Sequence, residues 1–596
     1  MAALRRTLPF LLLAGLALPA GANADRPTGL TAAIGHREVD LTWDAVAVPA
    51  DVAHARVVVR RYGHRIGAVD AGQTSFADTD VTPGDAYAYT IEVAGRRAGD
   101  TFTSPRSKRV RVSLPAYLVG AATADITPTG PVNLGGFGLG DGSVLPQDVA
   151  GQEVVGRGGV GETHGERIRA RAIVFDDGVN PAIAIADIET QGMFAAYEDG
   201  PYGLRDIAEQ VAKDVKGLPV DHILIASDHT HSGPDTIGAW GGVDPSYLRY
   251  IKAQTVKAIE DAYAARQLAD VRTGDSDASD LIYNQACTEA LNQSKTPDYP
   301  GPDACATPGK DGRFRVVQAT DPNGATVATY TAYAAHSTAG GGNGLHGDWP
   351  QFLSERMSSA FGGVGLAMEG ANGGTQPCRP ACAFTNPDNP GYNTPDRKSA
   401  LMLNYMAHVD DALAHTRPVR GQVDAAQSFV REPIVGPAVT ALFVGGAHTG
   451  TRLLRSHESP WVVGQTIRTI ASALRVGNVL FTGTPGEGFP AIGDGVRKAV
   501  PGADEVIQLG LANDQLGYLI APSRYVPIIA AEVAVNDNII FNVSPTIGDH
   551  VMCANITLAL DIGFDGKQLP QCAPYRALDA AGDPVGQVPV GGVVLP

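Results

Sequence analysis

Residues from about 27 to 114 alternate short apolar and polar runs. Strand-like segments of this kind cover residues 39–43, 55–62 and 86–93, and turns rich in Asp, Gly and Pro separate them. Short strands at this spacing are typical of a β-sandwich. We therefore expect a small all-β sandwich over residues 25–115, with its boundary at Leu114-Pro115.

From Tyr117 onward the pattern changes to alternating strand and helix signals. Buried strands are predicted at 168–175, 182–188, 221–226, 313–319, 326–335 and 478–482. Apolar positions at helical spacing predict helices at 199–215, 245–266, 348–361, 398–415 and 463–473. Alternation of this kind over such a length indicates a large mixed α/β domain, which we assign to residues 117–596.

Residues 1–24 have the pattern of a secretory signal peptide. Arg5 and Arg6 precede an apolar stretch at 8–18, and Ala22-Asn23-Ala24 provides small residues for cleavage. The apolar stretch is too short to span a bilayer. We expect the mature chain to begin near Asp25 and to be secreted, either to the exterior or into the cell envelope.

The composition and net charge of the chain limit the kinds of partner that it can bind. Only 18% of the residues are charged, and 71 glycines and 41 prolines suit a loop-rich extracellular enzyme. The net charge of −17 is spread along the chain, with no basic patch to neutralise phosphates. We therefore expect no nucleic-acid partner and at most peripheral contact with a membrane, and no feature implies a protein partner.

The chain has six cysteines, an even number that in an exported protein favours disulfides over a thiol nucleophile. Spacing does not settle the pairing. The sequence-local pairs are Cys287 with Cys305, Cys378 with Cys382, and Cys553 with Cys572.

The strand at 221–226 runs into Ser-Asp-His-Thr-His-Ser-Gly-Pro at 227–234. In extended backbone alternate side chains share one face, so His229 and His231 are expected to face one pocket. One could then bind a metal while the other handles charge or protons. The alternative is that both are polar residues on a loop edge.

Three further polar residues follow predicted strands or lie in loops. His336 ends the strand at 326–335 and precedes a glycine-rich turn, Glu487 follows the buried strand at 478–482, and Tyr518 lies in a later loop. Each is a candidate ligand. The spacing of these residues in the sequence does not by itself show that they lie close together in the fold.

Several short motifs occur in the order found in one enzyme family. They are His-Thr-His-Ser-Gly-Pro at 229–234, Ala-His-Ser-Thr at 335–338, Pro-Gly-Glu at 485–487 and Gly-Tyr at 517–518, with opening motifs at 119–128 and 167–175. In this order they resemble the neutral/alkaline non-lysosomal ceramidases. The resemblance runs from about Tyr117 to beyond Tyr525. Separately, Trp43 and the tyrosines Tyr87 and Tyr89 after a Thr-Pro-Gly turn make the first unit look like a fibronectin type III module.

The resemblance implies a zinc amidohydrolase that cleaves the N-acyl bond of ceramide. It implies one Zn²⁺ per chain, with His229, His336, Glu487 and Tyr518 as its ligands. Two imidazoles, a carboxylate and a phenolic oxygen are a suitable set for zinc, which acidifies a water and polarises a carbonyl. His231 would then be the catalytic residue that stabilises the oxyanion or moves protons to the leaving amine.

The chain departs from the family at several positions around the expected substrate. Gln376 stands where the family has an important serine, with Thr375 as the nearest hydroxyl, and Gln285 stands where the family has an arginine. Of the family's downstream tyrosines only Tyr525 is available. Thr375, Gln376 and Tyr525 are therefore the candidate substrate-binding residues, and the substrate itself stays open.

Three functions are compatible with the sequence. The first is a secreted zinc hydrolase of ceramide or a related N-acyl lipid. The second is a zinc hydrolase of the same fold that acts on a different amide or ester. The third is a catalytically impaired surface or adhesion protein, which the missing serine and arginine favour and which the retained ligands and His231 oppose.

Overall fold

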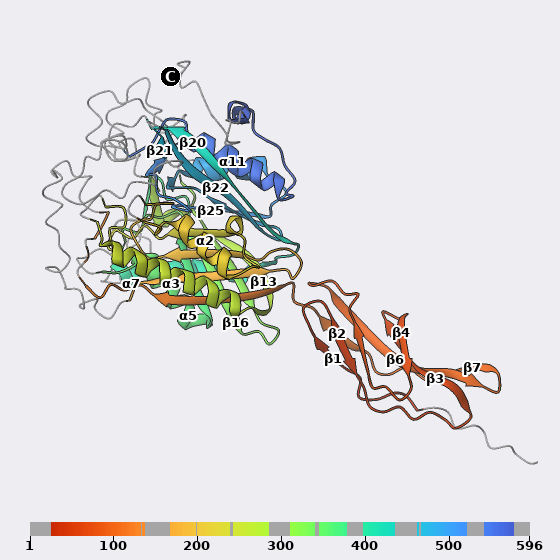
Figure 1. Ribbon diagram of the computed structural model, residues 1–596. Helices are drawn as coiled ribbons and strands as arrows, with labels where there is room; N and C mark the ends of the chain where they lie inside the picture. Colours follow the sequence, from red (N-terminus) through yellow and green to blue (C-terminus); the bar gives the residue numbers. More distant parts are fainter. Residues whose placement is uncertain are drawn as a thin grey trace, which may run out of the picture. The chain divides into compact units, whose positions relative to one another are not determined.

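The structure is a computed structural model (Figure 1). It describes residues 25–130, 132, 134–136, 167–197, 200–238, 242–284, 310–339, 345–377, 397–434, 462–463, 466–520 and 541–576. The chain divides into two compact units between Leu114 and Pro115.

The N-terminal unit consists of two antiparallel sheets. Its strands are β1 (Thr31–Ile34), β2 (Val39–Thr42), β3 (Val52–Arg61), β4 (His64–Asp70), β5 (Ser75–Asp78), β6 (Ala86–Arg97), β7 (Asp100–Thr103) and β8 (Val110–Ser113). One sheet has the order β1-β2-β5, and the other has the order β4-β3-β6-β7 with β8 on β6. Alternate residues of both sheets, such as Val39 and Leu41 on β2 and Val57 and Val59 on β3, share one apolar core with Trp43. The strands predicted at 39–43, 55–62 and 86–93 are confirmed.

The strands of the larger unit are β9 (Tyr117–Asp125), β10 (Arg169–Asp176), β11 (Ile183–Ile188), β12 (Ile223–Ser227), β13 (Gln267–Asp277), β14 (Ile282–Asn284), β15 (Arg313–Thr320), β16 (Thr326–Tyr333), β17 (Val364–Glu369), β18 (Thr375–Pro377), β19 (Arg417–Pro418), β20 (Val423–Pro433), β21 (Val462–Val463), β22 (Thr466–Val476), β23 (Val479–Gly483), β24 (Glu487–Gly488), β25 (Glu505–Leu509) and β26 (Tyr518–Leu519). Its α-helices are α2 (Leu204–Asp214), α3 (Pro245–Ala264), α5 (Asp348–Phe361), α7 (Arg397–Ala414), α9 (Pro490–Ala499) and α11 (Ile547–Asp561). Short 3₁₀ helices are η2 (Val220–His222), η3 (Ser279–Leu281) and η8 (Pro570–Arg576).

These strands form two principal sheets. A nine-stranded sheet has the order β12-β11-β10-β9-β13-β15-β16-β17, with β19 on β13, and a five-stranded sheet has the order β20-β22-β23-β25, with β21 on β22. The pairs β11–β12, β16–β17 and β23–β25 are parallel, whereas most other neighbours are antiparallel. The unit is therefore a mixed, sheet-rich α/β fold and not a regular series of parallel strands.

The two sheets pack against each other and carry helices on their outer faces. On β11, Ala184 and Ala186 join the core beneath α2 and α3, while Ile183 and Ile185 point to the core shared with the five-stranded sheet. Helices α5 and α7 cover strands β15 to β17, and α9 and α11 cover the five-stranded sheet. Figure 1 shows α11 beside β20 and β22. Because both faces are covered, the strands read as nearly continuous apolar runs.

One predicted helix is wrong. Residues 463–473 were expected to be helical, but most of them belong to β22, which pairs with β20 along its whole length and then with β23. Thr466, Ile467, Thr469 and Ile470 are β-branched, which favours a strand over a helix. A short apolar run is compatible with the periodicity of a helix and with that of a strand, and here the pairing with β20 makes it a strand.

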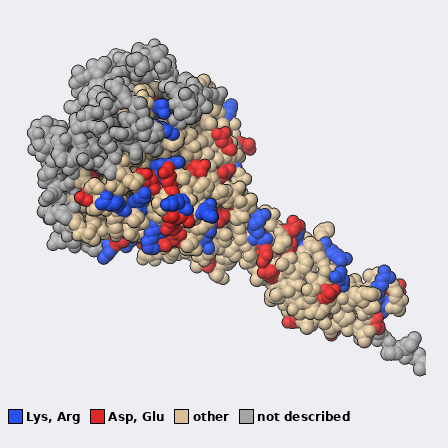
Figure 2. Space-filling view, viewed as in Figure 1, with Lys and Arg blue, Asp and Glu red and all other residues tan. Residues whose placement is uncertain are grey.

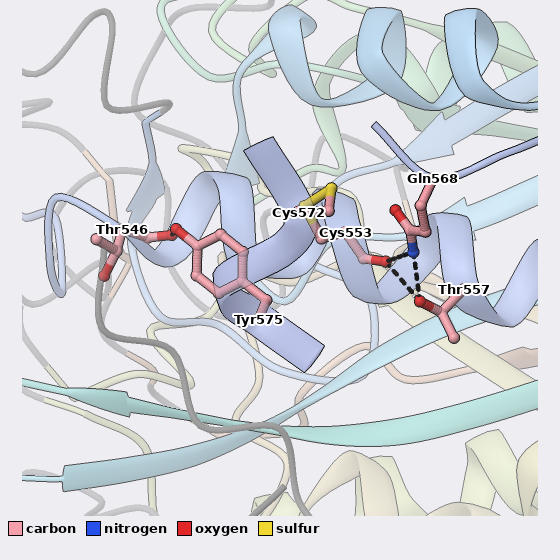
Figure 3. Close-up of a disulfide and its surroundings, with 6 residues drawn as sticks. All are labelled: Thr546, Cys553, Thr557, Gln568, Cys572 and Tyr575. Carbon is pink, nitrogen blue, oxygen red and sulfur yellow. Dashed lines mark hydrogen bonds between the residues drawn. A yellow bond between two sulfur atoms is a disulfide. The ribbon is translucent and has the colours of Figure 1, made fainter. Parts of the chain in front are cut away.

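The disulfide Cys553–Cys572 is present and joins α11 to η8, as the local pairing predicted. Figure 3 shows this disulfide, with Gln568 donating hydrogen bonds to the carbonyl of Cys553 and to Thr557. The other four cysteines lie outside the described residues. None of the helices in the described part of the chain has the length and apolar character of a membrane span.

Candidate metal centre

Three residues singled out in the sequence follow the ends of buried strands that belong to both principal sheets. His229 comes two residues after β12, His336 three residues after β16, and Glu487 four residues after β23. Main-chain hydrogen bonds connect the sheets here, since the amide of Asn513 donates to the carbonyl of Ile225 at 2.7 Å. The site is thus assembled where β12 and β16, from separate parts of one sheet, meet the loops that follow β23 and β25.

His229 is positioned by a turn. Its φ of 51° lies in the left-handed region, which residues other than glycine adopt rarely. Its Nδ1 donates to the carbonyl of Gln191 at 2.8 Å, so the lone pair of the ring is on Nε2. The expectation that extended backbone places His229 and His231 on one face is wrong in its geometry. The turn nevertheless brings the two rings together, with centroids 4.8 Å apart.

His336 is oriented in the same manner by the loop that follows β17. Its Nδ1 lies 3.0 Å from the carbonyl oxygen of Asn372 and 3.1 Å from that of Thr375. Its own amide also donates to Thr375 at 3.2 Å. These carbonyls accept the Nδ1 proton, and Nε2 is left facing Glu487.

Glu487 lies between the two imidazoles. Its Oε1 is 3.4 Å from Nε2 of His229, and its Oε2 is 3.0 Å from Nε2 of His336. Its backbone is fixed by the parallel pairing of β24 with β26, and its amide donates to the carbonyl of Gly517 at 2.8 Å. The carboxylate is therefore aimed at two side chains from the opposite sheet.

Tyr518 is the residue paired with Glu487 across β24 and β26. Its buried ring stacks on His336, with centroids 6.2 Å apart and an interplanar angle of 29°. The main chain of Tyr518 is held on both sides, because its amide donates to Phe541 at 3.1 Å and its carbonyl accepts from Asn542 at 2.8 Å. Sequence reasoning selected this residue, and the fold places it beside the histidines.

His231 completes the cluster. Its Nε2 is 3.3 Å from Nε2 of His229, and its amide donates to the carbonyl of Ser337 at 3.1 Å. Among the described residues, His229, His231 and His336 are the group of side chains that meets the spacing of a metal site, with ligand atoms within 4.8 Å of one another. Gly136 borders the ring so closely that a Cβ there would lie 2.4 Å from it.

The pKa of His231 is shifted in the opposite direction from the pKa values of His229 and His336. Burial by itself would lower the pKa values of His229 and His336, but Glu487 outweighs burial and raises both. Burial would likewise raise the pKa of Glu487, but the two imidazoles hold it well below its usual range. For His231, burial and the like charges of His229 and His336 outweigh the attraction of Glu487 and keep its pKa well below the ordinary value. The neutral form of the His231 imidazole is therefore favoured.

This donor set fits a divalent cation of the zinc type. Ligands about 2.0–2.1 Å from a tetrahedral zinc lie about 3.3–3.4 Å from one another. The separations of 3.3 Å between His229 and His231, 3.4 Å between His229 and Glu487, and 3.0 Å between His336 and Glu487 are close to that spacing. A metal would take the place of the protons that the histidines otherwise share with the carboxylate.

Of the expected substrate-binding residues, the structure describes Thr375 and Gln376, and both side chains form hydrogen bonds within the protein. The hydroxyl of Thr375 donates within its own turn, to the carbonyls of Ala371 at 3.1 Å and Asn372 at 3.0 Å. The side-chain oxygen of Gln376 accepts from the hydroxyl of Thr338 at 2.8 Å, two residues after His336. Tyr525 lies outside the described residues, as does Gln285.

The sequence reasoning missed the groups that orient the histidines. Gln191 and Asn372 act through main-chain carbonyls, which leave no trace in residue type. Glu369, at the end of β17, accepts from the side chain of Asn372 and lies behind His336. Strand β17 itself is not among the strands predicted from the sequence, so Glu369 could not be recognised as a carboxylate at a strand end.

Comparison with known proteins bears on the fold. Neither the protein-family models nor the curated proteins give a match to this sequence. Among solved structures, neutral ceramidase from Pseudomonas aeruginosa is similar, with a TM-score of 0.55, 17% identity, and coverage of 76% of each chain. A ceramidase complexed with C2 is similar too, with a TM-score of 0.54, 17% identity, and coverage of 76% of this chain and 77% of the other. At this level of identity the likeness shows a shared fold.

Proposed function

We propose that this protein is a secreted zinc-dependent amidohydrolase that cleaves the N-acyl bond of ceramide or a related N-acyl lipid. The observation that carries the proposal is the convergence of three imidazoles and one carboxylate at ligand spacing. The shared fold with two ceramidases supports the choice of reaction. The ceramidase motifs in the sequence point to the same reaction, so we assign residues 117–596 as a ceramidase-like catalytic domain.

In this proposal His229, His336, Glu487 and Tyr518 hold one Zn²⁺ per chain. Bound zinc supplies a Lewis acid for the amide carbonyl and lowers the pKa of a water. The chain's own contribution is orientation. Carbonyls of Gln191 and Asn372 hold the histidine rings with Nε2 toward the ion, which is the usual support for zinc ligands.

His231 is the proposed catalytic residue. A partly buried imidazole whose pKa is held low can take a proton during attack and return it to the leaving amine. Its Nε2 is close enough to His229 to be a ligand instead. The zinc content of a His231 variant distinguishes these two roles.

The regions outside the catalytic domain complete the proposal. Residues 1–24 are proposed to be a signal peptide that is removed on export. Residues 25–115 are proposed to be a fibronectin type III-like β-sandwich, a suggestion supported by the two antiparallel sheets around Trp43.

A second candidate is a zinc hydrolase of the same fold that acts on a different amide or ester. The observation that favours it is the position of Gln376. Its side chain replaces the family's serine and is hydrogen-bonded to Thr338 beside the cluster. A site whose polar partners for one substrate have changed can discriminate strongly against that substrate.

The test is a substrate panel combined with metal analysis. The mature protein is assayed on a fluorescent N-acyl sphingosine, on simpler N-acyl amines and on esters, and its zinc content is measured. We expect about one zinc per chain and cleavage of the N-acyl sphingosine. Cleavage of another amide or ester without the sphingolipid would select the second candidate. Absence of zinc, with no effect of His229→Ala, would reject both.

A further inference from the structure

The N-terminal unit contains a pocket rich in arginine. A concavity of about 400 Å³ is lined by the guanidinium-bearing residues Arg26, Arg106 and Arg109, with Thr90 and Ser107 between them. Arg26 precedes β1, Thr90 lies on β6, and the other three belong to the segment between β7 and β8. No carboxylate is among the described residues that line it.

The charge in and around this pocket is not balanced. Glu92 is the neighbouring acid, and it is shared by Arg60 at 2.7 Å and Arg106 at 3.2 Å. Arg26 and Arg109 form no ion pair with any described residue. Of the three arginines that line the pocket, Arg106 alone is therefore paired with a carboxylate in the described part of the chain. Figure 2 shows the Lys and Arg side chains of this unit concentrated along one edge in that view.

The walls of the pocket are fixed by backbone contacts. The side chain of Ser107 accepts from the amide of Ile91 at 3.0 Å, and the amide of Ser107 donates to the Ile91 carbonyl at 2.8 Å. These bonds fasten the segment that carries Arg106 and Arg109 onto β6. On the opposite side, Arg60 donates to the carbonyl of Gly63 at 3.0 Å and so fixes the β3–β4 turn. The arginines are therefore presented from a rigid frame.

This arrangement suits a tetrahedral oxyanion. Guanidinium groups offer paired N–H donors that match the oxygens of phosphate or sulfate, and they remain charged at any physiological pH. Thr90 is a hydroxyl-bearing residue of the same lining. The pocket is large enough for a phosphate together with the small group attached to it.

The rim points to a lipid surface as the source of this anion. Tyr62, next to Gly63, is 60% exposed, and its hydroxyl donates to the carbonyl of Ala86. An exposed aromatic ring with a satisfied polar end, beside basic residues, is typical of the membrane–water interface. The proposed substrate is also a membrane lipid, and the choice of a lipid surface over a soluble anion rests on that proposed function.

We propose that the pocket of Arg26, Arg106 and Arg109 binds the phosphate of an anionic lipid headgroup and holds the enzyme at membranes. The site is local and depends on two unpaired arginines. It requires no basic run in the sequence.

The test compares two double variants of the mature chain, each of which loses two positive charges. Arg26→Gln with Arg109→Gln removes the unpaired cations of the pocket. Arg37→Gln with Arg65→Gln, two exposed arginines of the same unit outside the pocket, is the matched control. Cosedimentation is measured with ceramide-free vesicles of phosphatidylcholine, with and without phosphatidylglycerol. Thermal melting checks that both variants are folded.

We expect the unmodified chain to bind only the vesicles that contain phosphatidylglycerol. The pocket variant should bind them about thirtyfold more weakly, because each of the two lost basic residues contributes on the order of 1 kcal/mol at an anionic surface and about 1.4 kcal/mol corresponds to a tenfold change, and the control should bind unchanged. Equal losses in both variants, or no binding to any vesicle, would overturn the proposal.

A second experiment measures the binding of inorganic phosphate and of dextran sulfate by calorimetry. Binding of these soluble anions without binding to vesicles would overturn the assignment to a lipid. Hydrolysis of a detergent-dispersed N-acyl substrate is recorded in parallel, so that failure of docking and failure of the proposed activity are distinguished.

Discussion

In the described part of the larger unit, histidine meets a buried glutamate at two places, which are organised differently. In the metal centre, His229 and His336 both approach Glu487 through Nε2. Between β20 and α11, His550 approaches Glu432 through Nδ1 at 2.8 Å. All of these residues are buried.

The difference lies in what satisfies the other polar atoms. In the candidate metal centre, main-chain carbonyls take both Nδ1 protons, and two imidazoles approach the carboxylate. Glu432 in contrast also accepts hydrogen bonds from the hydroxyls of Ser544 and Thr546. Tyr575 stacks on His550, with ring centroids 4.6 Å apart, and Figure 3 shows this tyrosine on the segment held by the disulfide. The same residue types therefore give a carboxylate shared by two imidazoles in one place and, in the other, a carboxylate that also accepts from two hydroxyls.

Removing a histidine from each pair should give the largest contrast. We expect His336→Ala to lose zinc and more than about 10³-fold of the hydrolytic activity, because an open site needs its full ligand set. His550→Ala should retain about one zinc per chain. Metal analysis of both proteins, with circular dichroism as a check of folding, measures the contrast. Zinc retained in His336→Ala would remove this residue from the ligands.

His231→Ala tests whether this histidine belongs to the metal or to the chemistry. We expect kcat to fall by about 10²–10⁴-fold while zinc stays near one per chain, because loss of a positioned acid–base group has effects of that size. Kinetics and metal analysis on one preparation are sufficient. Parallel loss of zinc would make His231 a ligand.

Glu432→Gln tests the pair of Glu432 with His550. We expect the free energy of unfolding to fall by about 1–3 kcal/mol, because the hydroxyls of Ser544 and Thr546 and the Nδ1 of His550 lose the buried carboxylate that accepts their hydrogen bonds. Zinc content should not change. Denaturant unfolding of the wild-type and variant proteins measures this effect, and the absence of destabilisation would show that the pair is not a structural element.

The remaining prediction concerns the buried carboxyl group of Glu369, which acts electrostatically on His336. Burial raises the pKa of Glu369 from its ordinary value near 4.5 to about 8. Because the folded state holds this proton more tightly than the unfolded state does, its stabilising contribution is present below about pH 4.5 and is lost as the pH rises to about 8.

The measurement is thermal unfolding of chelator-treated protein across this pH range. Glu369→Gln should flatten that part of the stability profile, because the amide cannot ionise. An unchanged slope in the variant would assign the pH dependence to other groups.

The sequence predicted secondary structure correctly where the signal lies in neighbouring residues. Periodicity correctly predicted β10, β11, β15, β16, α3 and α5, because alternate or i, i+3/i+4 burial is recorded in neighbouring residues. It failed at β22, where Ile- and Thr-rich residues satisfy either period until β20 pairs with them. Motif order selected His229, His336, Glu487 and Tyr518, but their roles as ligands remain predictions.

What the sequence determined by itself was the set of chemical groups and the strands that end beside them. Only the tertiary structure decided that these groups meet, because residues more than a hundred positions apart are brought together by the packing of two sheets. It also decided that His229 turns at a positive φ, that carbonyls of Gln191 and Asn372 orient the rings, and that Arg26 and Arg109 share one pocket. These outcomes depend on main-chain groups and long-range contacts, which residue type and spacing do not encode.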